Sequence, residues 1–352
     1  MLLFYSLMGW MLAPSLDANP ERAHQNFLPE TPPAPSRDAG YLAGGLWLRF
    51  DTYFYIDIAE QGYKRPAAVV FFPLYPLLIR ALTYLGMPPL AAALLISRLA
   101  AFLLLWGMQR LLLLDLPKST VRIAAVLLLL WPGSFILFAA YPDSMVMAAT
   151  IWALVFARSE RWWGATACAA IAATTKAVGV FVVLPLVIIA WRQHAKPWLQ
   201  MLVVLATAGI YPLYLGAIGQ ITPDLAYRTY WATTVSLPWQ TVWSALNAIS
   251  AGNFIAALNL TFLIAVTLLA LWQPIRREYL VYSIALILLF LTKKTEPILQ
   301  STLRYLLAVF PAMAALALKT ASSAWLLVLT GFLLFGLNLL ALYGFWNWYL
   351  IV

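Results

Sequence analysis

Long apolar runs, separated by short loops rich in arginine and lysine, make up the chain from about residue 89 to residue 343. Of the 352 residues, 64% are hydrophobic and only 10% are charged, whereas about a quarter of the residues in soluble domains are charged. A soluble fold cannot cover so much apolar surface, so lipid must solvate most of the chain. The sequence therefore predicts an all-α, polytopic membrane protein whose single transmembrane domain covers residues 1–352.

The apolar runs predict about eleven transmembrane helices. The first, over residues 1–13, is short for a full span of about 20 residues. Several others are also short, so we expect them to tilt, to break or to be partly enclosed by protein. A second long outer segment is expected at 217–253. The remaining expected helices cover residues 89–113, 122–140, 143–157, 163–175, 178–191, 198–216, 254–272, 279–292, 305–318 and 323–343.

Charged residues in the short loops indicate how the helices are oriented. If the helices alternate in direction, five loops with ten basic and three acidic residues fall on one side. By the positive-inside rule this side is cytoplasmic. The net charge of +9 is then mainly a topology signal, and we expect no nucleic-acid partner. The ten basic residues are Arg110, Lys118, Arg122, Arg158, Arg161, Arg192, Lys196, Arg276, Arg277 and Lys319.

The opposite, extracytoplasmic side carries one long loop, residues 14–88. Val69 to Leu85 is apolar enough to enter the membrane, but a full span there would put the basic loops on alternate sides. Two prolines interrupt it, so we expect juxtamembrane or re-entrant helices. Residues 42–63 mix aromatic and charged side chains and predict an interfacial helix. Seven of the thirteen acids lie in residues 14–66, namely Asp17, Glu21, Glu30, Asp38, Asp51, Asp57 and Glu60.

Four of the outer acids are candidates for chemistry. Asp57 and Glu60 are spaced i, i+3 and share one helix face, and Asp51 precedes them by one to two turns. A carboxylate beside bulky aromatic side chains at a membrane surface is partly desolvated, which raises its basicity and suits a general base. The alternative is a solvated acidic face. Asp143 follows Tyr141 in a tight outer turn, where it could act in chemistry, cap the next helix, or both.

Basic residues on the same side could bind an anion. Lys176 interrupts an apolar stretch, which is costly unless it pairs, reaches water or extends to the interface. Lys293, Lys294 and Arg304 crowd between two helices, which suits phosphate recognition, or else forms a charged loop with internal pairs. A base that activates a hydroxyl and cations that steady a departing phosphate would fit a phosphate-linked lipid substrate. With one cysteine, Cys168, no disulfide or Cys-based metal site is expected.

Several short motifs together resemble the signature of the GPI mannosyltransferase 2, or PIG-V, family. That signature is a W-D … I-A-x-x-G-Y stretch followed by F-F-P-L-Y-P, with later motifs Y-S-E-S, T-R-x-x-G and R-Y … F-P. This chain differs in having Phe50, Asp143 and Lys176 where the family has Trp, Glu and Arg. The matching segments are RFDTYFYIDIAEQGY at 49–63, FFPLYP at 71–76, YPDS at 141–144, TKAVG at 175–179, RY at 304–305 and FP at 310–311.

The resemblance implies a GT-C glycosyltransferase that moves a sugar, mannose in the family, from a polyprenyl-phosphate donor to a lipid or glycan acceptor with inversion. It implies an active site on the non-cytoplasmic face of a prokaryotic plasma membrane, or of the ER membrane in a eukaryote. We expect no obligatory cofactor or metal, since the acids are dispersed. The resemblance maps the catalytic base onto Asp51. The residues expected to orient the acceptor or the base are Asp57, Glu60, Asp143, Arg49, Tyr63 and Tyr75. Those expected to bind the donor phosphate are Lys176, Arg304, Lys293 and Lys294.

Two other functions compete with glycosyl transfer. A transporter or flippase for polyprenyl-linked lipids or sugars predicts charged groups near the bilayer midplane and a repeated half, and the sequence contains no internal repeat. A non-enzymatic membrane scaffold would not need an acidic loop that faces a cationic loop. The clustering of acids at one interface therefore favours the transferase.

Overall fold

The computed structural model describes residues 1–16, 33–272 and 275–349 of the chain. In these ranges the molecule is almost entirely helical, and its two strands form one short antiparallel sheet in which Thr233 pairs with Thr295. This confirms the predicted all-α fold class. Asp17, Glu21 and Glu30, three acids of the predicted outer loop, lie outside the described residues.

The elements of the described ranges have the following bounds: α1 (Leu2–Leu12), η1 (Ala13–Ser15), α3 (Ala39–Ala43), η2 (Gly45–Trp47), α4 (Asp51–Gln61), η3 (Pro66–Val70), α5 (Leu74–Tyr84), α6 (Pro89–Leu112), α7 (Lys118–Leu130), η4 (Ser134–Leu137), α8 (Asp143–Arg158), α9 (Trp162–Thr175), η5 (Ala177–Val182), α10 (Val183–Arg192), α11 (Trp198–Ala217), α12 (Pro223–Tyr230), β1 (Thr233–Val235), α13 (Pro238–Ser250), α14 (Phe254–Trp272), α15 (Arg277–Thr292), β2 (Lys293–Thr295), α16 (Thr302–Leu306), α17 (Phe310–Thr320) and α18 (Ala324–Trp346).

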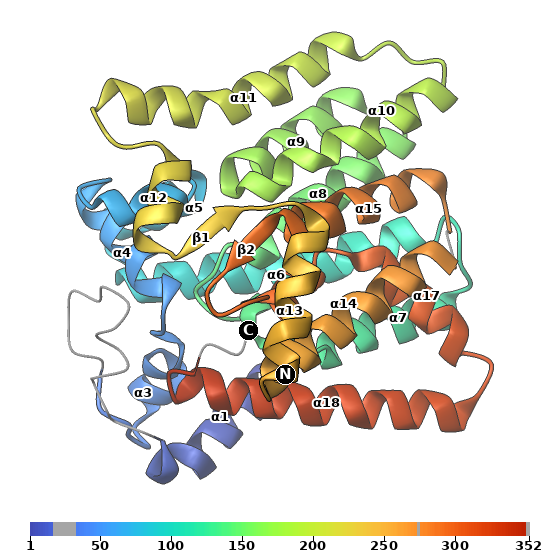
Figure 1. Cartoon of the computed structure of the whole chain (residues 1–352). Coiled ribbons are helices and arrows are strands. Elements are labelled where there is room, and N and C mark those ends of the chain that lie inside the picture. The colour runs from blue at the N-terminus through green and yellow to red at the C-terminus, as the bar shows by residue number, and fades with distance from the viewer. Residues whose placement is uncertain (17–32, 273–274, 350–352) are drawn as a thin grey trace.

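The long helices lie side by side across Figure 1, from α11 at the top to α18 at the bottom. Helix α8 is the central element, since it packs against both α6 and α9. The short helices α3, α4, α5 and α12 gather at the left-hand end in this view, and the β1–β2 sheet lies close to α13. The fold is therefore a helical bundle with smaller elements collected toward one end.

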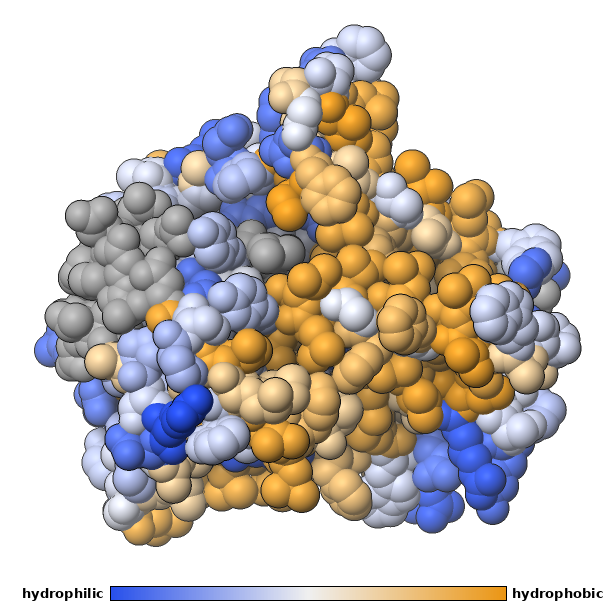
Figure 2. All heavy atoms as spheres, turned by 90° about the horizontal axis from the view of Figure 1, so that it is seen from below, coloured by the Kyte–Doolittle hydropathy of each residue, from blue (hydrophilic) through white to orange (hydrophobic). Residues whose placement is uncertain are grey.

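Among the described residues, four helices are long and apolar enough to cross a membrane: α6, α11, α14 and α18. They present large apolar side chains outward, as Phe332 of α18 does. From below, apolar side chains cover the middle of the molecule and hydrophilic ones gather toward its ends (Figure 2). This pattern is that of a membrane protein. It does not confirm eleven spans, because the other expected helices are shorter.

Prolines and glycines account for two of these shorter helices. The helix expected at 122–140 ends at Leu130, because Pro132 cannot continue the backbone ladder and Gly133 takes a positive φ of 90°. The helix expected at 305–318 is instead two helices, α16 and α17, and Pro311 stands in the first turn of the second. Both breaks lie beside the polar interior described below.

The predicted interfacial helix at 42–63 is also interrupted. It consists of α3, η2 and α4, and the last break falls at Phe50, whose φ is 48°. Residues 66–84 form η3 and the 11-residue helix α5. At 1.5 Å per residue, α5 is only about 16 Å long, too short to span a bilayer. It agrees with the expected juxtamembrane segment, although η3 is a 3₁₀ helix.

The charged residues of the basic loops meet at one end of the bundle. Asp115 accepts hydrogen bonds from Arg158 and from Arg276, each at 3.0 Å, and Glu278 accepts one from Arg192 at 3.0 Å. Arg158 is the last residue of α8, whereas Asp143 is the first. The two ends of this 16-residue helix are about 22 Å apart. Charged residues of four of the five predicted basic loops therefore meet here, away from Asp143.

Candidate functional site

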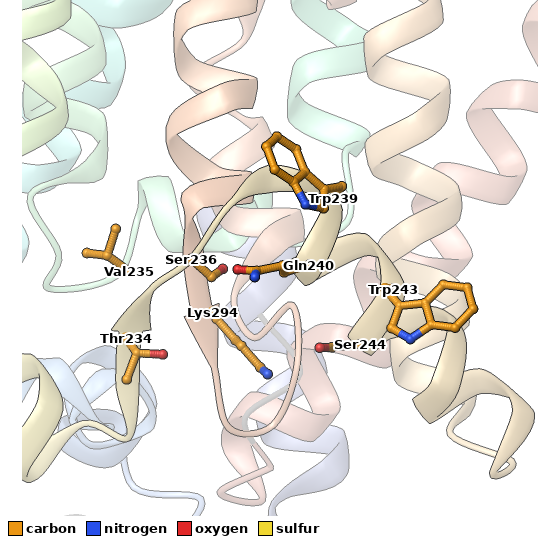
Figure 3. A pocket seen from close by; sticks show the side chains of 8 residues that line it. All are labelled: Thr234, Val235, Ser236, Trp239, Gln240, Trp243, Ser244 and Lys294. Carbon is orange, nitrogen blue, oxygen red and sulfur yellow. The ribbon is translucent and has the colours of Figure 1, made fainter.

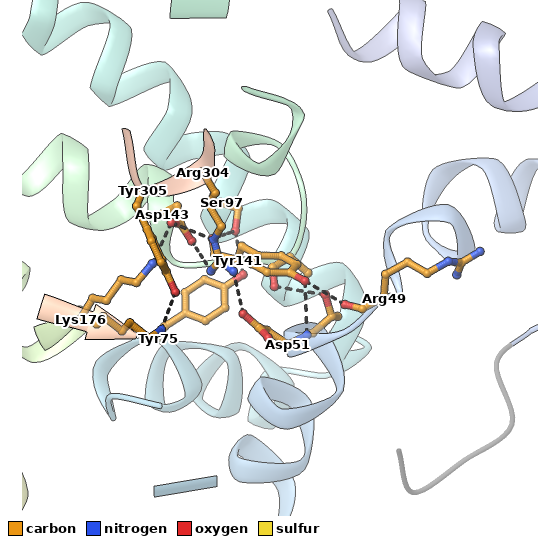
Figure 4. Close-up of polar contacts among 12 residues, drawn as sticks. Arg49, Asp51, Tyr75, Ser97, Tyr141, Asp143, Lys176, Arg304 and Tyr305 are labelled. Carbon is orange, nitrogen blue, oxygen red and sulfur yellow. Dashed lines mark hydrogen bonds and ion pairs between the residues drawn. The ribbon is translucent and has the colours of Figure 1, made fainter. Parts of the chain in front are cut away.

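An arginine joins two carboxylates in the interior of the bundle. Arg304 donates two hydrogen bonds to Asp143, from Nε to Oδ1 at 3.1 Å and from Nη2 to Oδ2 at 2.7 Å. Its third nitrogen, Nη1, donates to Asp51 Oδ2 at 2.8 Å. Figure 4 shows the guanidinium between the two acids. Residues from α4, α8 and α16, up to 253 positions apart in the chain, thus form one network.

Helix ends bring these groups together. Asp51 and Asp143 are the first residues of α4 and α8, where a carboxylate interacts favourably with the positive end of the helix dipole. Lys176 follows the last residue of α9 in an extended conformation, and its Nζ donates to Asp143 Oδ1 at 2.8 Å. The turn at Lys176, an interruption in the apolar pattern, therefore sends an ammonium group into the same network.

Asp51 and Asp143 differ in what their carboxylates can still do. Asp143 is buried, and both of its oxygens accept hydrogen bonds from Arg304, one of them also from Lys176. Asp51 has a side chain that is 21% exposed. Within the described ranges, its carboxylate accepts only the bond to Oδ2 from Arg304. The other oxygen, Oδ1, is therefore open to a ligand.

The backbone before Asp51 is held in an unusual conformation. Phe50 has a positive φ of 48°, rare for a bulky residue, and its ring packs against Phe345 and Trp348. The hydroxyl of Tyr141 accepts from the Asp51 amide at 3.3 Å and donates to the Arg49 carbonyl at 3.2 Å. These contacts fix the direction in which the Asp51 side chain leaves the chain.

A second cation lies beyond the carboxylate network. Lys293 donates to the hydroxyl of Tyr305 at 2.9 Å, and its ammonium also lies 5.2 Å from the centre of the Tyr227 ring. Burial alone would lower the pKa of Lys293. The neighbouring phenol oxygens of Tyr305 and Tyr227 have the larger effect, so the pKa lies above its usual value. No carboxylate among the described residues pairs with Lys293, so its positive charge is not neutralised.

Tyr305 links the two lysines. Its ring centre lies 5.3 Å from the ammonium of Lys176 and 5.0 Å from that of Lys293. Burial raises the pKa of this phenol, but Lys293, Lys176 and Arg304 together outweigh burial, and the pKa falls below its usual value. The network as a whole contains three cations and two carboxylates, so it favours an added anion.

All of these groups line one cavity of about 800 Å³. Its lining includes the polar side chains of Asp51, Arg304 and Lys176 and aromatic rings such as those of Trp231 and Phe71. Small-molecule sites typically have a volume of this order and combine apolar walls with a few convergent polar groups. The cavity can therefore hold a ligand with an anionic group and an apolar or sugar-like portion.

Two acids of the predicted site lie elsewhere. Asp57 is buried on another face of α4 and pairs with Arg65 at 3.2 Å. Glu60 is exposed. Neither residue lines the cavity. Asp57 lies six positions after Asp51, so on a helix the two side chains point in directions about 240° apart.

Three other predicted orienting residues, Arg49, Tyr63 and Tyr75, do not line the cavity. The Arg49 guanidinium points away from Asp51 (Figure 4) and donates to the carbonyls of Trp346 and Gly45. Tyr75 donates to the Ala93 carbonyl at 2.9 Å, and Tyr63 to the Phe71 carbonyl at 2.7 Å. Their hydroxyl and guanidinium groups are thus engaged with backbone oxygens, which makes them scaffold residues.

The two adjacent lysines of β2 diverge. Lys293 lines the large cavity, whereas Lys294 lines a separate pocket formed with β1 and α13 (Figure 3). Consecutive residues of a strand point to opposite faces, which explains the separation. Of the four cations predicted to bind phosphate, the structure therefore brings Lys176, Arg304 and Lys293 together and leaves Lys294 outside.

Three tyrosines of the site were not among the predicted residues: Tyr141, Tyr305 and Tyr227. Tyr141 and Tyr305 lie inside the short motifs, next to Pro142 and Arg304, so the sequence contained a signal for them. Tyr227 lies in the outer segment 217–253, where nothing singled it out. In the described ranges no group of three or more histidine, cysteine or acidic side chains could hold a metal ion.

Comparison with known proteins adds no relative. No family model, no curated protein and no solved structure matches this chain. The assignment of a function therefore depends on the geometry of the site and on the motif resemblance.

Proposed function

We propose that the chain is a membrane glycosyltransferase of the GT-C type that transfers a sugar, mannose by resemblance, from a polyprenyl-phosphate donor. One observation carries the proposal. The carboxylate of Asp51, which has one oxygen without a hydrogen-bond partner among the described residues, lies in the same cavity as three cations. The two carboxylates of the network balance only two of these three positive charges. A base next to an anion-binding cluster is the arrangement that this reaction needs.

Asp51 is the proposed general base. Its Oδ1 takes the proton of the acceptor hydroxyl while the hydroxyl oxygen attacks the anomeric carbon of the sugar. The bond between that carbon and the phosphate oxygen breaks, and its electron pair stays with the phosphate. Attack from the face opposite the phosphate inverts the anomeric configuration. The protonated Asp51 then loses its proton to water.

The cations are proposed to receive the phosphate. Among the described residues Lys293 has no carboxylate partner, and the ammonium groups of Lys176 and Lys293 both lie near the Tyr305 ring, so a phosphate in contact with both would gain two charge-assisted contacts. Arg304 is already engaged by two carboxylates. Its proposed role is to hold Asp51 and Asp143 in place and to add positive charge close to the reacting centre.

The number and orientation of the membrane segments are part of this proposal. A GT-C enzyme of this kind would have about eleven membrane segments, of which the shorter ones would be tilted or enclosed by protein. The positive-inside rule places the Asp115 end in the cytoplasm. The Asp51 cavity would then open on the non-cytoplasmic face, where a polyprenyl-phosphate sugar and a glycolipid or glycan acceptor would meet.

Sugar transfer by the purified protein tests this function. The protein in lipid nanodiscs receives polyprenyl-phosphate-[³H]mannose and a lipid extract of the producing cells as the acceptor source. We expect labelled product with the wild-type chain. We expect Asp51→Asn to lower kcat by about 10²- to 10⁴-fold, because proton transfer to a positioned base contributes about that much.

The matched control is Glu60→Gln, which removes an exposed carboxylate from the same helix outside the cavity. It should keep the wild-type rate. Full activity of Asp51→Asn would refute the base assignment. Movement of the labelled donor across a proteoliposome membrane without any sugar transfer would instead favour the transporter.

A further inference from the structure

The pocket around Lys294 is a second polar feature of the surface, distinct from the proposed active site. It has a volume of about 510 Å³, and its lining combines the ammonium of Lys294 with hydroxyl groups, an amide and two indole rings. Lys294 pairs with Thr234 through the backbone, but among the described residues no hydrogen bond or ion pair involves its ammonium group. The pocket therefore presents an unbalanced positive charge among hydrogen-bond donors. Its polar residues are Thr234, Ser236, Gln240, Ser244 and Lys294.

Helix α13 forms the apolar side of this pocket and has two different faces. Thr241 and Ala245, one turn apart, are buried. Trp239 and Trp243, also one turn apart, are 65% and 66% exposed. Figure 3 shows the Trp243 indole projecting away from the strand that carries Lys294. Exposed tryptophans beside a lysine are typical of side chains at the boundary between lipid tails and head groups.

The length and direction of α13 fit the same location. Its 13 residues extend about 20 Å, less than the hydrocarbon thickness of about 30 Å. In Figure 1 it runs across the long axis of α18 instead of along it. A short helix with an apolar face that crosses the direction of the spans is suited to lie in the membrane interface.

We infer that this pocket binds the phosphate head group of an anionic phospholipid from the surrounding leaflet. Lys294 would pair with the phosphate, the hydroxyls of Ser236 and Ser244 would donate to it, and Trp239 and Trp243 would contact the glycerol and upper acyl chains. Because Thr234 and Val235 line both this pocket and the large cavity, the lipid lies beside the wall of the proposed active site. The inference depends on membrane residence and does not depend on sugar transfer.

Photocrosslinking in nanodiscs tests this site. The discs contain phosphatidylcholine with roughly one-fifth phosphatidylglycerol, so that the leaflet carries negative charge. A trace of phosphatidylglycerol with a diazirine near the glycerol serves as the probe. We expect crosslinks in the peptide that contains Trp239 and Trp243. Lys294→Gln should reduce them by about fivefold, the effect of one basic residue near an anionic surface.

Two variants and one probe control the experiment. Lys294→Arg keeps the charge and should retain crosslinking, which separates loss of charge from misfolding. Lys64→Gln removes an exposed lysine elsewhere in the outer loop and should leave crosslinking unchanged. Equal crosslinking of wild type and Lys294→Gln, or equal labelling by a phosphatidylcholine probe, would overturn the assignment. Neither readout measures sugar transfer, so failure here is distinct from failure of the proposed function.

Discussion

At the residue scale, the separation of Lys293 from Lys294 shows why charge alone does not define a binding site. Both lysines are neighbours in a three-residue strand, and only the pleat sends the first into the large cavity. Residue spacing could reveal a basic cluster, but assigning each member to a face required the pairing of β2 with β1, whose partners lie some sixty residues apart in the chain. Such non-local pairing leaves little local signal.

Lys293 is therefore the cation whose removal should most specifically weaken donor binding. We expect Lys293→Gln to raise the KM for a polyprenyl-phosphate sugar by about tenfold, which corresponds to the loss of one hydrogen bond to a charged group. Its kcat should change less, because Asp51 and Arg304 stay in place. Steady-state kinetics would measure both constants. Lys64→Gln is the control, and an unchanged KM for Lys293→Gln would contradict the role.

The same scale shows what the sequence could predict of the site. Asp51, Asp143, Lys176 and Arg304 were expected on one side, because Asp51 lies in the long outer loop and the other three lie at breaks between apolar runs. Their mutual pairing was not predictable, since it depends on how α4, α8 and α16 pack. Asp57 lies close to Asp51 in the sequence, but it is on another face of the same helix and so does not reach the site.

At the element scale, the turn between α9 and η5 depends on close packing of backbone. A Cβ at Gly179 would lie 2.0 Å from the carbonyl oxygen of Ala172 and 2.2 Å from its carbon. Both are backbone atoms of α9, which cannot move aside as a flexible side chain can. The Thr175 to Gly179 motif thus needs glycine so that η5 can approach α9 and direct Lys176 into the cavity.

We therefore expect Gly179→Ala to destabilise the protein by about 1–3 kcal/mol, the usual range for overpacking. Activity should also fall, because the turn that carries Lys176 must shift. The control is Gly209→Ala in α11, where no atom lies within 4 Å of the added methyl group. There the better helix propensity of alanine should leave stability equal or slightly higher. Thermal unfolding in detergent would compare them, and equal midpoints for Gly179→Ala and wild type would disprove the packing argument.

Element boundaries followed the sequence best where an apolar run was continuous. The helices at 89–112, 198–217 and 254–272 match the expected ranges within two residues, because continuous apolar runs leave few alternatives in lipid. Helix α13 and strands β1 and β2 were missed inside one long outer segment or at a helix end. Their apolar residues do not form a run long enough to predict.

At the scale of the whole molecule, two polar clusters lie at opposite ends of the bundle. Helix α15 begins next to Arg276 and ends next to Lys293, so it connects the two clusters over about 25 Å. At the end away from the cavity, Asp115 and Glu278 join the loop after α6 to the ends of α8, α10 and α15. We therefore expect this cluster to hold the ends of these helices together.

Glu278 is the most buried member of this cluster, with 0% of its side chain exposed. It contacts Arg192 at 3.0 Å and also pairs with Arg276. Its replacement by glutamine would leave Arg192 without its anion and Arg276 paired with Asp115 alone. Loss of one partner of a buried pair costs about 3–5 kcal/mol, but both arginines are partly exposed to solvent, so we expect about 2 kcal/mol for Glu278→Gln.

Asp224→Asn provides the matched comparison, because the pair between Asp224 and Arg228 is 57% exposed on both sides. Exposed pairs contribute about 0–1 kcal/mol, so its unfolding midpoint should stay close to wild type. Added salt should reduce the difference in unfolding midpoint between Glu278→Gln and Asp224→Asn only slightly, since buried pairs are screened less than exposed ones. If Glu278→Gln unfolds at the same temperature as Asp224→Asn, the cluster does not hold the helix ends together, and the apolar contacts of α8 and α15 must fix them.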